Sequence, residues 1–533
     1  MSNEHLRSRR VSRRDMLQAA GLGGLGLLAA ACGSSSGASS SHRPSGRAAG
    51  ATRSTPPSFV ISDDGIKLPT GDVSLHWMDS GDAKAYFFKA FFAALHKKYP
   101  NINVSYDGTN WNEIDQAVAI GLRNGSAPDV FQLPPQLPVA EAVSNGYLGA
   151  VDDIITNWSE VKRRFPVGTF ANGVTDFDNK TYGMPFTSNK RIGNLLLYNV
   201  EQVKRADYDL GGGPISWDEL RAVAKKCTKQ GNGQYYGIIF GLTQEGGLSG
   251  PFSTLAQMSG LAGGFDAGDT VDAGIDWKTG QFNYTADLTL EAIELMLALK
   301  SDGSIFPGAA SLDQPGIRER FPQGVASLIL QGPWNVAIWQ QSNPGFKFGV
   351  SLPPVKKPKA KLWPLTYGPG GSNTWYYNAK TKLSSVIGLI YSYLSTNAGQ
   401  IEWADYDGGG DPPQFPAAFE RESLGPVATK ALQLGKTYTA IGPEPAVRNP
   451  DVEKVYEAYI PLETNCSDTL NGLFTGQITG KLPTVMKDLQ DRTEKSLETA
   501  IATARKRGAK VERDDWVFPD WNPAEPYTKM YQK

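Results

Sequence analysis

An alternation of short β-prone runs and amphipathic helices constrains the fold of this chain most. The run 72–79 is β-prone, residues 83–98 carry Phe and Leu at helical spacing, and 102–106 is again β-prone. A helix over 111–124 and a strand over 129–133 complete the series. Strand–helix–strand–helix–strand connections predict a parallel sheet with helices on both faces.

The second part of the chain shows the same kind of pattern, without a fixed internal repeat. We expect further strands at 194–198, 326–330 and 375–377, and further helices at 216–229, 288–300, 386–394 and 483–507. Ser216 followed by Glu219 is a capping box that should begin the helix at 216–229. With 533 residues, at about 100–200 residues per domain, the chain is predicted to form two α/β lobes.

The N-terminus has the features of an export signal. Arginines crowd the first fourteen residues, an apolar stretch follows, and residues 1–31 together form a signal rather than a membrane span. The run Ser12–Leu17 resembles the twin-arginine export motif. The end of the stretch resembles a bacterial lipobox, with Cys32 as the lipidated residue, although Ala29 stands where a Leu is usual. Plain secretion is the alternative. Residues 32–71 read as a flexible Ser/Gly/Pro-rich tether.

The residue inventory excludes several classes of function. The chain has only four His and three Cys, no HExxH and no CxxC, so we expect no catalytic His, no metal site and no cofactor. A formal net charge of −1 argues against nucleic-acid binding. No 18-residue apolar run follows residue 31, so nothing in the body should span a bilayer. Cys227 and Cys466 could pair in an oxidising compartment, but we favour two separate buried thiols.

A series of short motifs resembles the extracellular solute-binding proteins of bacterial ABC importers. The likeness is to the carbohydrate-type family 1, which includes maltose-binding protein, and the motifs follow the family's order over roughly residues 72–505. The motifs are Leu75–Asp79, Tyr99–Val104, Ala127–Gln132, Asp178–Phe186, Leu196–Asn199, Ser216–Leu220, Phe321–Ala326 and Gly332–Trp334.

The resemblance implies a two-lobe periplasmic-binding-protein type II fold, with discontinuous lobes joined by crossing strands. Lobe 1 would comprise 72–185 plus 354–395, and lobe 2 would comprise 186–353 plus 396–533. The lobes would close around one solute by a hinge motion. The resemblance also implies a monomer without catalytic activity that delivers its solute to the permease subunits of an importer. With the lipid anchor, it would lie on the extracytoplasmic face of the cell membrane.

A sugar needs flat aromatic walls and hydrogen-bonding side chains, and open α/β sheets bind ligands at strand ends. Trp334 is the main candidate, because the resemblance implies that the Trp of this Gly-Pro-Trp stacks on the sugar; a core Trp is the alternative. One of Asp79 and Asp82 should instead cap a helix. Gln136 is a weaker candidate. The candidate ligand-binding residues are Trp77, Asp79, Asp82, Gln132, Phe186, Asn189, Trp334, Trp375, Tyr376, Trp403 and Tyr406.

Two other functions stay open at this point. The same fold could bind a non-sugar solute, such as a phosphorylated polyol or a peptide-like compound, and a cleft rich in Arg or Lys would favour this. A secreted carbohydrate-active enzyme would need two carboxylates facing each other across the ligand, roughly 5–10 Å apart. The leading hypothesis is a receptor for a sugar or oligosaccharide, whose identity and chain length the sequence does not specify.

The Cys32→Ser variant tests the anchor. We expect it to be released from membranes without unfolding, because the tether carries no core residues. Fractionation after a salt wash, with circular dichroism of the released protein, measures both properties. Membrane retention of the variant would contradict lipidation at Cys32.

Overall fold

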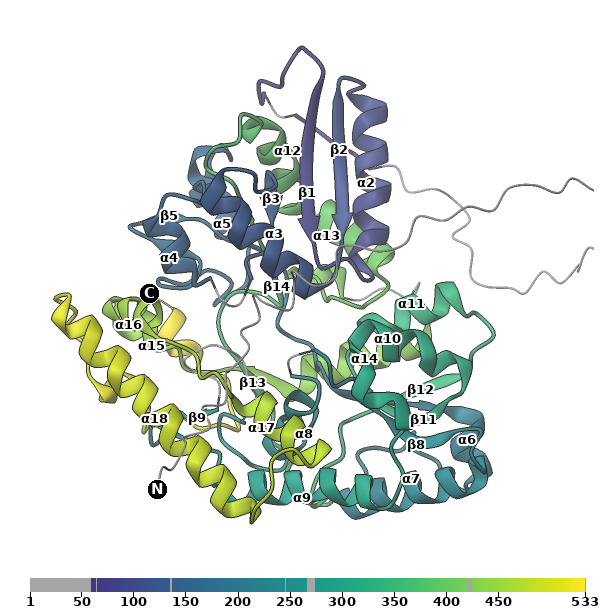
Figure 1. Cartoon of the computed structure of the whole chain (residues 1–533). Coiled ribbons are helices and arrows are strands. Elements are labelled where there is room, and N and C mark those ends of the chain that lie inside the picture. Colours follow the sequence, from purple (N-terminus) through teal and green to yellow (C-terminus); the bar gives the residue numbers. More distant parts are fainter. Residues whose placement is uncertain are drawn as a thin grey trace, which may run out of the picture. The chain divides into compact units, whose positions relative to one another are not determined.

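The computed structural model describes residues 59–532 except 64, 135–136, 245, 266–273 and 420–423 (Figure 1). All of these belong to one compact unit. The predicted export signal, Cys32, most of the tether and Gln136 lie outside the described residues. The prediction that the tether carries no core residues was wrong for its last part, because Ile61 is buried in the core beside α2 (Lys84–Lys98) and Phe59, Ile66 and Leu68 pack against it. In the part of the chain that is described, none of the helices is both long and apolar enough to cross a membrane.

The first of two main sheets has five strands in the order β2-β1-β3-β14-β6. Its strands are β1 (Val73–Asp79), β2 (Ile102–Gly108), β3 (Val130–Phe131), β6 (Met184–Thr187) and β14 (Asn373–Tyr377). β1 pairs in parallel with β2 and β3, as the alternating pattern predicts. β14 runs antiparallel to β3 and β6. The predicted parallel arrangement of the first three strands is thus confirmed, whereas the direction of β14, which comes from a distant part of the chain, was not predicted.

The second main sheet has four strands in the order β12-β7-β11-β8. Its strands are β7 (Leu195–Asn199), β8 (Tyr236–Ile239), β11 (Ala326–Gln331) and β12 (Phe348–Ser351). β11 is parallel to β8 but antiparallel to β7, which is also antiparallel to β12. Every residue of β7 and β11 is buried, because helices cover this sheet on both faces.

Helix α2 (Lys84–Lys98) illustrates how the sequence builds the core of the first sheet. Phe87, Phe88, Phe91, Phe92 and Leu95 form its buried face, at the spacing that predicted the helix. The other long helices near this sheet are α3 (Trp111–Asn124), α12 (Ser384–Leu394) and α13 (Asn397–Asp407), and α13 packs against α2.

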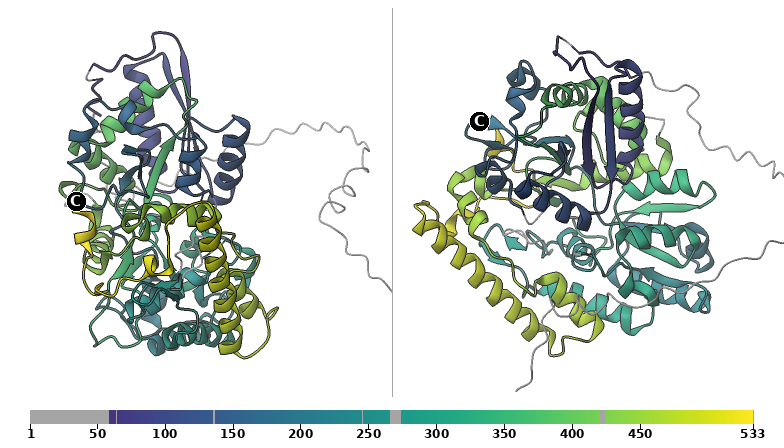
Figure 2. Two further views of the ribbon diagram at one scale, coloured as in Figure 1. Left: turned by 90° about the vertical axis from the view of Figure 1, so that its left-hand side faces the viewer. Right: turned by 45° about the horizontal axis from the view of Figure 1, so that its top comes forward.

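The second sheet is packed by α7 (Trp217–Gly231), where Ser216 Oγ accepts a hydrogen bond from the Glu219 amide at 3.0 Å. The predicted C-terminal helix is α18 (Leu482–Lys506), which lies beside α16 (Figure 1 and Figure 2). Met486 is buried in α18 where the pattern predicted Val485, which is only partly buried.

The remaining elements are shorter or connect the sheets. The helices are α4 (Val139–Ser144), α5 (Trp158–Lys162), α6 (Val200–Arg205), α8 (Ser249–Met258), α9 (Asp287–Ser301), α10 (Gln314–Arg320), α11 (Trp334–Ser342), α14 (Gly425–Tyr438), α15 (Pro445–Arg448), α16 (Glu453–Ala458) and α17 (Cys466–Thr475). The small sheets pair β4 (Asp176–Phe177) with β5 (Lys180–Thr181), β9 (Ile275–Asp276) with β10 (Gln281–Phe282), and β13 (Leu365–Tyr367) with β15 (Thr439–Ile441).

The two remaining cysteines are separate buried thiols, as expected. Cys227 lies within α7, and Cys466 begins α17 with its Sγ 3.5 Å from the carbonyl oxygen of Phe265. Burial raises the pKa of the Cys227 thiol, although Ser327 and Lys226 oppose this shift. Both cysteines therefore serve the core of the second sheet.

Candidate functional site

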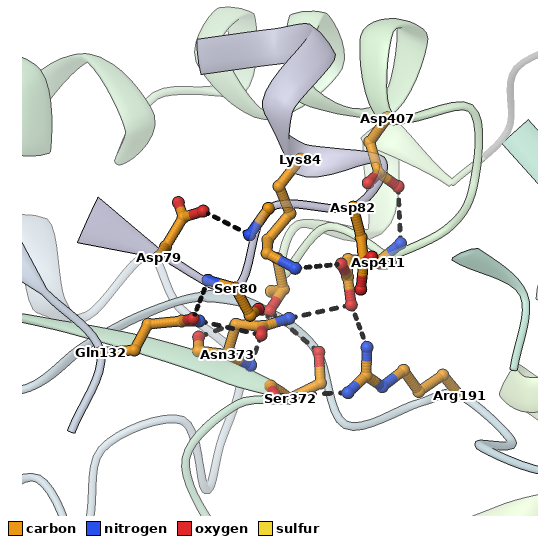
Figure 3. Close-up of polar contacts among 12 residues, drawn as sticks. Asp79, Ser80, Asp82, Lys84, Gln132, Arg191, Ser372, Asn373, Asp407 and Asp411 are labelled. Carbon is orange, nitrogen blue, oxygen red and sulfur yellow. Dashed lines mark hydrogen bonds and ion pairs between the residues drawn. The ribbon is translucent and has the colours of Figure 1, made fainter. Parts of the chain in front are cut away.

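Polar side chains from several distant segments of the chain contact one another in a buried group (Figure 3). We call Lys84, Arg191, Asn373, Asp407 and Asp411 the Asp411 cluster. Lys84 begins α2, Arg191 lies between β6 and β7, and Asn373 begins β14. Asp407 ends α13 and Asp411 lies in the loop that follows. The cluster therefore joins segments that are far apart in the sequence.

Asp411 is the centre of this cluster, and its side chain is only 1% exposed. Its carboxylate lies 3.4 Å from Lys84 Nζ, accepts a hydrogen bond from Asn373 Nδ2 at 2.9 Å and forms an ion pair with Arg191. The loop 408–413 contains three consecutive glycines, yet residues 409–413 are buried around Asp411, because the carboxylate finds two cations and an amide there.

The surroundings shift the pKa values of Asp407 and Asp411 in opposite directions. Burial opposes ionisation of Asp411, but Lys84 and Arg191 outweigh it and hold the pKa of Asp411 below its ordinary value. Burial and the adjacent Asp411 raise the pKa of Asp407 well above its ordinary value. Asp407 Oδ2 accepts a hydrogen bond from the Asp411 amide at 2.6 Å, whereas Oδ1 is buried without a hydrogen-bond partner among the described residues.

The turn after β1 is fixed by two side chains that the sequence assigned to the ligand. Gln132 Oε1 accepts a hydrogen bond from the Ser80 amide at 2.8 Å, and Asp79 Oδ1 accepts one from the Gly81 amide at the same distance. Gln132 Nε2 in turn donates to Asn373 Oδ1 at 2.9 Å. Asp79 and Gln132 are both buried, so their contacts support the turn and do not present oxygens to solvent.

Asp79 also anchors three aromatic side chains. Its carboxylate accepts hydrogen bonds from the hydroxyl of Tyr106 at 2.7 Å and from the indole nitrogens of Trp77 and Trp375, both at 3.2 Å. Burial raises the pKa of Asp79, although Lys84 and these hydrogen bonds oppose the shift. Its role in this structure is to satisfy buried donors.

Most of the predicted aromatic ligand residues are core residues. Trp77, Phe186, Trp375 and Trp403 have no exposed surface and belong to the same hydrophobic cluster as the phenylalanines of α2. Tyr376 is buried in a different cluster, on the opposite side of its strand. Their burial assigns these five side chains to packing, because none offers a ring face to a ligand.

Trp334, Asp82, Asn189 and Tyr406 keep partly exposed side chains. Trp334 is the first residue of α11, and the Arg191 guanidinium lies 5.1 Å from the centroid of its ring. Asn189 Nδ2 donates to the carbonyl oxygen of Gly368 at 3.1 Å. Tyr406 stacks on Phe59 with ring centroids 5.5 Å apart, so it lies at the edge of the α2 core.

Trp334 and the turn after β1 meet at Gly410. A Cβ atom added to Gly410 would lie 2.9 Å from Trp334 Cα and 3.0 Å from Ala83 Cβ. Asp82, which precedes Ala83, forms an ion pair with Arg318 of α10. Trp334 and Asp82 therefore come from different sheets to one region beside the Asp411 cluster.

Sequence reasoning missed Lys84, Arg191, Arg318, Asn373 and Asp411. Lys84 carries a weak signal, since a lysine in the first turn of a helix opposes the helix dipole and calls for a compensating acid. The partner of that lysine is more than 300 residues away, which the sequence pattern does not reveal. Within the described residues, no group of His, Cys, Asp and Glu side chains could hold a metal ion.

Replacing Asp407 and Asp411 by Asn should change stability with opposite dependence on pH. The folded-state pKa of Asp407 is raised, so its ionisation opposes folding above the ordinary value of 3.8, and Asp407→Asn should be more stable than the wild type at neutral pH. The pKa of Asp411 is lowered, so its charge contributes stability above 3.8, and Asp411→Asn should be less stable at neutral pH.

The Asp407 difference should shrink as the pH falls toward its ordinary pKa of 3.8, where the wild-type carboxyl becomes protonated in the unfolded chain as well. The Asp411 difference should persist down to 3.8 and shrink only below it, as the pH falls through the lowered pKa of the folded state. Urea unfolding from about pH 2 to pH 8 measures both differences. Equal stability of Asp407→Asn and wild type across this range would contradict the raised pKa of Asp407.

Comparison with known proteins gives the fold and the family. The fold resembles the GacH receptor of Streptomyces glaucescens (17% identity, TM-score 0.59, covering 80% of this chain and 99% of that one). It also resembles MalE3 of T. maritima, with 17% identity and a TM-score of 0.59 over 79% of this chain and 99% of that one. An ABC transporter solute-binding protein of Thermotoga lettingae is 19% identical, with a TM-score of 0.60 over 80% of this chain and 99% of that one.

A curated relative, an uncharacterised lipoprotein from the oleD 5′ region of Streptomyces antibioticus, is 26% identical over 216 residues, or 38% of this chain. The match spans 44% of that relative, which is less than half of its length. Residues 79–401, more than half of the chain, match the bacterial extracellular solute-binding proteins. The resemblance predicted from the short motifs is thus confirmed, and the chain belongs to the family of bacterial extracellular solute-binding proteins.

Proposed function

We propose that this protein is a receptor that captures a sugar or an oligosaccharide beside Trp334 and delivers it to an ABC importer. One observation carries the proposal. Trp334 follows the carboxyl end of the buried strand β11 and keeps a partly exposed indole, at the place where the two sheets approach each other at Gly410. Strand ends of this kind are where α/β folds bind ligands.

The chemistry of the exposed side chains fits a sugar. An indole face packs against the C–H groups of a pyranose, and Asp82 and Asn189 offer oxygen and nitrogen atoms to its hydroxyl groups. The solved structures of similar fold include complexes with acarbose, maltose and α-D-tagatose. These ligands support a carbohydrate as the solute class.

The arrangement of carboxylates supports binding rather than glycoside hydrolysis. A glycosidase needs two carboxyl groups that reach the ligand. Asp79, Asp407 and Asp411 are buried and engaged with protein groups, whereas the side chain of Asp82 is 25% exposed, so among these four described carboxylates only Asp82 is accessible. The relatives by family are likewise binding proteins.

Lys84, Arg191 and Arg318 would favour an anionic solute if they lacked partners. Lys84 and Arg191 are paired with Asp411, and Arg318 is paired with Asp82. Because each of these three positive charges already has a carboxylate, they support a neutral polyhydroxylated ligand better than a phosphorylated one.

We further propose that Cys32 is lipidated after twin-arginine export and that the body acts as a monomer at the extracytoplasmic face of the membrane. The lipoprotein from Streptomyces antibioticus supports the anchor. The two lobes would close around the sugar. The bounds 72–185 plus 354–395 and 186–353 plus 396–533 stay a prediction, except that the whole of β6 and α13 pack with the first sheet.

A thermal-shift screen tests the solute class. The panel is maltose, maltotriose, acarbose and tagatose, with sorbitol 6-phosphate and a tripeptide as alternatives. A ligand at 100 times its dissociation constant stabilises the folded state by about 2.7 kcal/mol, so a true ligand gives a clear rise in melting temperature. A rise with only the phosphorylated polyol or the tripeptide would refute the sugar proposal.

The Trp334→Ala variant tests the stacking role. We expect it to bind the sugar identified in the screen much more weakly while its melting temperature without sugar stays near that of the wild type, because the indole is partly exposed. Trp403→Ala is the matched control, since loss of a fully buried Trp should lower the unfolding free energy by about 3–5 kcal/mol. Unchanged affinity in Trp334→Ala would remove Trp334 from the site.

A further inference from the structure

An ion pair joins the two sheets outside the Asp411 cluster. Asp82 lies in the turn between β1 and α2 of the first sheet, and its carboxylate pairs with Nη1 of Arg318. Arg318 lies on α10, whose Ile317 packs in the core of the second sheet with residues of β7 and β11. The pair is thus a direct contact between elements that belong to different sheets.

Asp82 is held in a conformation that favours this contact. Its φ is 59°, in the left-handed region that non-glycine residues rarely adopt, and the preceding Gly81 has a φ of 63°. Gly81 cannot be replaced without strain, because an added Cβ would lie 3.1 Å from the backbone carbon of Gly108. The turn is also fixed by hydrogen bonds from the Gly81 amide to Asp79 and from the Ser80 amide to Gln132. An unusual backbone conformation that surrounding contacts maintain is often tied to function.

Arg318 is equally constrained from its own side. Its backbone oxygen accepts a hydrogen bond from Trp339 Nε1 at 2.9 Å, and its side chain is only 10% exposed. Nε of Arg318 is buried and has no hydrogen-bond partner in the described part of the chain. Since most of the guanidinium is withdrawn from water, Asp82 is its main charge partner, and loss of Asp82 would leave a nearly buried cation uncompensated.

We propose that the Asp82–Arg318 pair is a latch that holds the two halves of the protein together, with Arg318 acting as a positioning residue for the ligand site. The pair stabilises the arrangement in which Trp334 and the turn after β1 lie beside each other at Gly410. Its effect on affinity rests on the proposed function, whereas its effect on the separation of the two halves does not.

The latch has a quantitative consequence for binding. If only the latched arrangement binds sugar, the apparent dissociation constant equals the intrinsic constant divided by the fraction of molecules in that arrangement. Removing the pair should therefore weaken binding by about threefold to tenfold, because the Asp82 end of the pair is partly exposed and the ion pair is correspondingly weak. Asp82→Asn and Arg318→Gln should both weaken sugar binding, even if only one of the two residues lies near the ligand.

A distance measurement without sugar tests the latch itself. Spin labels are placed on the full chain carrying Cys32→Ser, at Lys97→Cys on α2 and Lys229→Cys on α7, which are both exposed positions. Double electron–electron resonance measures the distance between the two labels. This distance should be longer in Asp82→Asn, in Arg318→Gln and in the double variant than in the wild type. Arg320→Gln, which changes an exposed arginine on the same helix, should leave it unchanged. Identical distances in all variants would overturn the latch.

A double-mutant cycle with maltotriose as the probe tests the effect on binding. With a latch, both single variants lose affinity and the double variant binds no more weakly than Asp82→Asn, because both substitutions remove the same ion pair and Asp82→Asn also removes the proposed contact of Asp82 with the sugar. A loss of affinity in Asp82→Asn alone would make Asp82 a simple sugar contact, and a loss in Arg318→Gln alone would make Arg318 one; either result overturns the latch. If the wild type does not bind maltotriose, the proposed ligand class fails for this probe, and the distance measurement still decides the latch.

Discussion

The carboxylate of Asp411 is the contact on which the arrangement of the two sheets depends. It neutralises Lys84 of α2 and Arg191 of the connection between the sheets, and it accepts the amide of Asn373 at the start of β14. The backbone of the same loop continues the connection, since the Ser188 amide donates to the carbonyl oxygen of Pro412 at 2.7 Å. A buried carboxylate with two cationic partners is costly to disrupt, because removing one partner leaves a buried charge uncompensated, at about 3–5 kcal/mol.

The geometry of the candidate site follows from this centre. The guanidinium of Arg191 lies against the ring of Trp334 while it pairs with Asp411, so the indole and the buried carboxylate share one neighbour. Asn373 also accepts a hydrogen bond from Gln132, and Gln132 in turn accepts one from the Ser80 amide in the turn before Asp82. The two side chains that we assign to the ligand region and the latch are therefore oriented from the same buried group, although they belong to different sheets.

The sequence predicted the local elements well because their signals are local. The phenylalanines of α2 and the cap at Ser216 depend on spacing within a few residues, and both are where the pattern placed them. The direction of β14 depends on where a distant segment joins the sheet, and the local pattern carries no signal for it, so the antiparallel pairing of β14 with β3 and β6 was not predicted.

The aromatic candidates for the ligand site show a different limit of the sequence pattern. Trp375 and Tyr377 point to one face of β14 and Tyr376 to the other, and both faces are buried, in separate clusters. A strand end rich in aromatics is therefore typical of a core as well as of a ligand site. Trp334 differs from these residues because it follows Gly332 and Pro333 and begins a helix, which places it beyond the end of the strand and leaves the indole partly exposed.

The pairing of charges around the site bears on which solutes it can accept. An anionic ligand that approached Arg191 or Arg318 would compete with Asp411 or Asp82, and the displaced carboxylate would then lack a partner in a region of low solvent exposure. A neutral sugar does not require either ion pair to break, because its hydroxyl groups can donate to carboxylate oxygens that remain paired. If the solute binds at the site that we propose, the ion pairs that join the two sheets also disfavour charged solutes, and the same charges then serve both the fold and the specificity of the site.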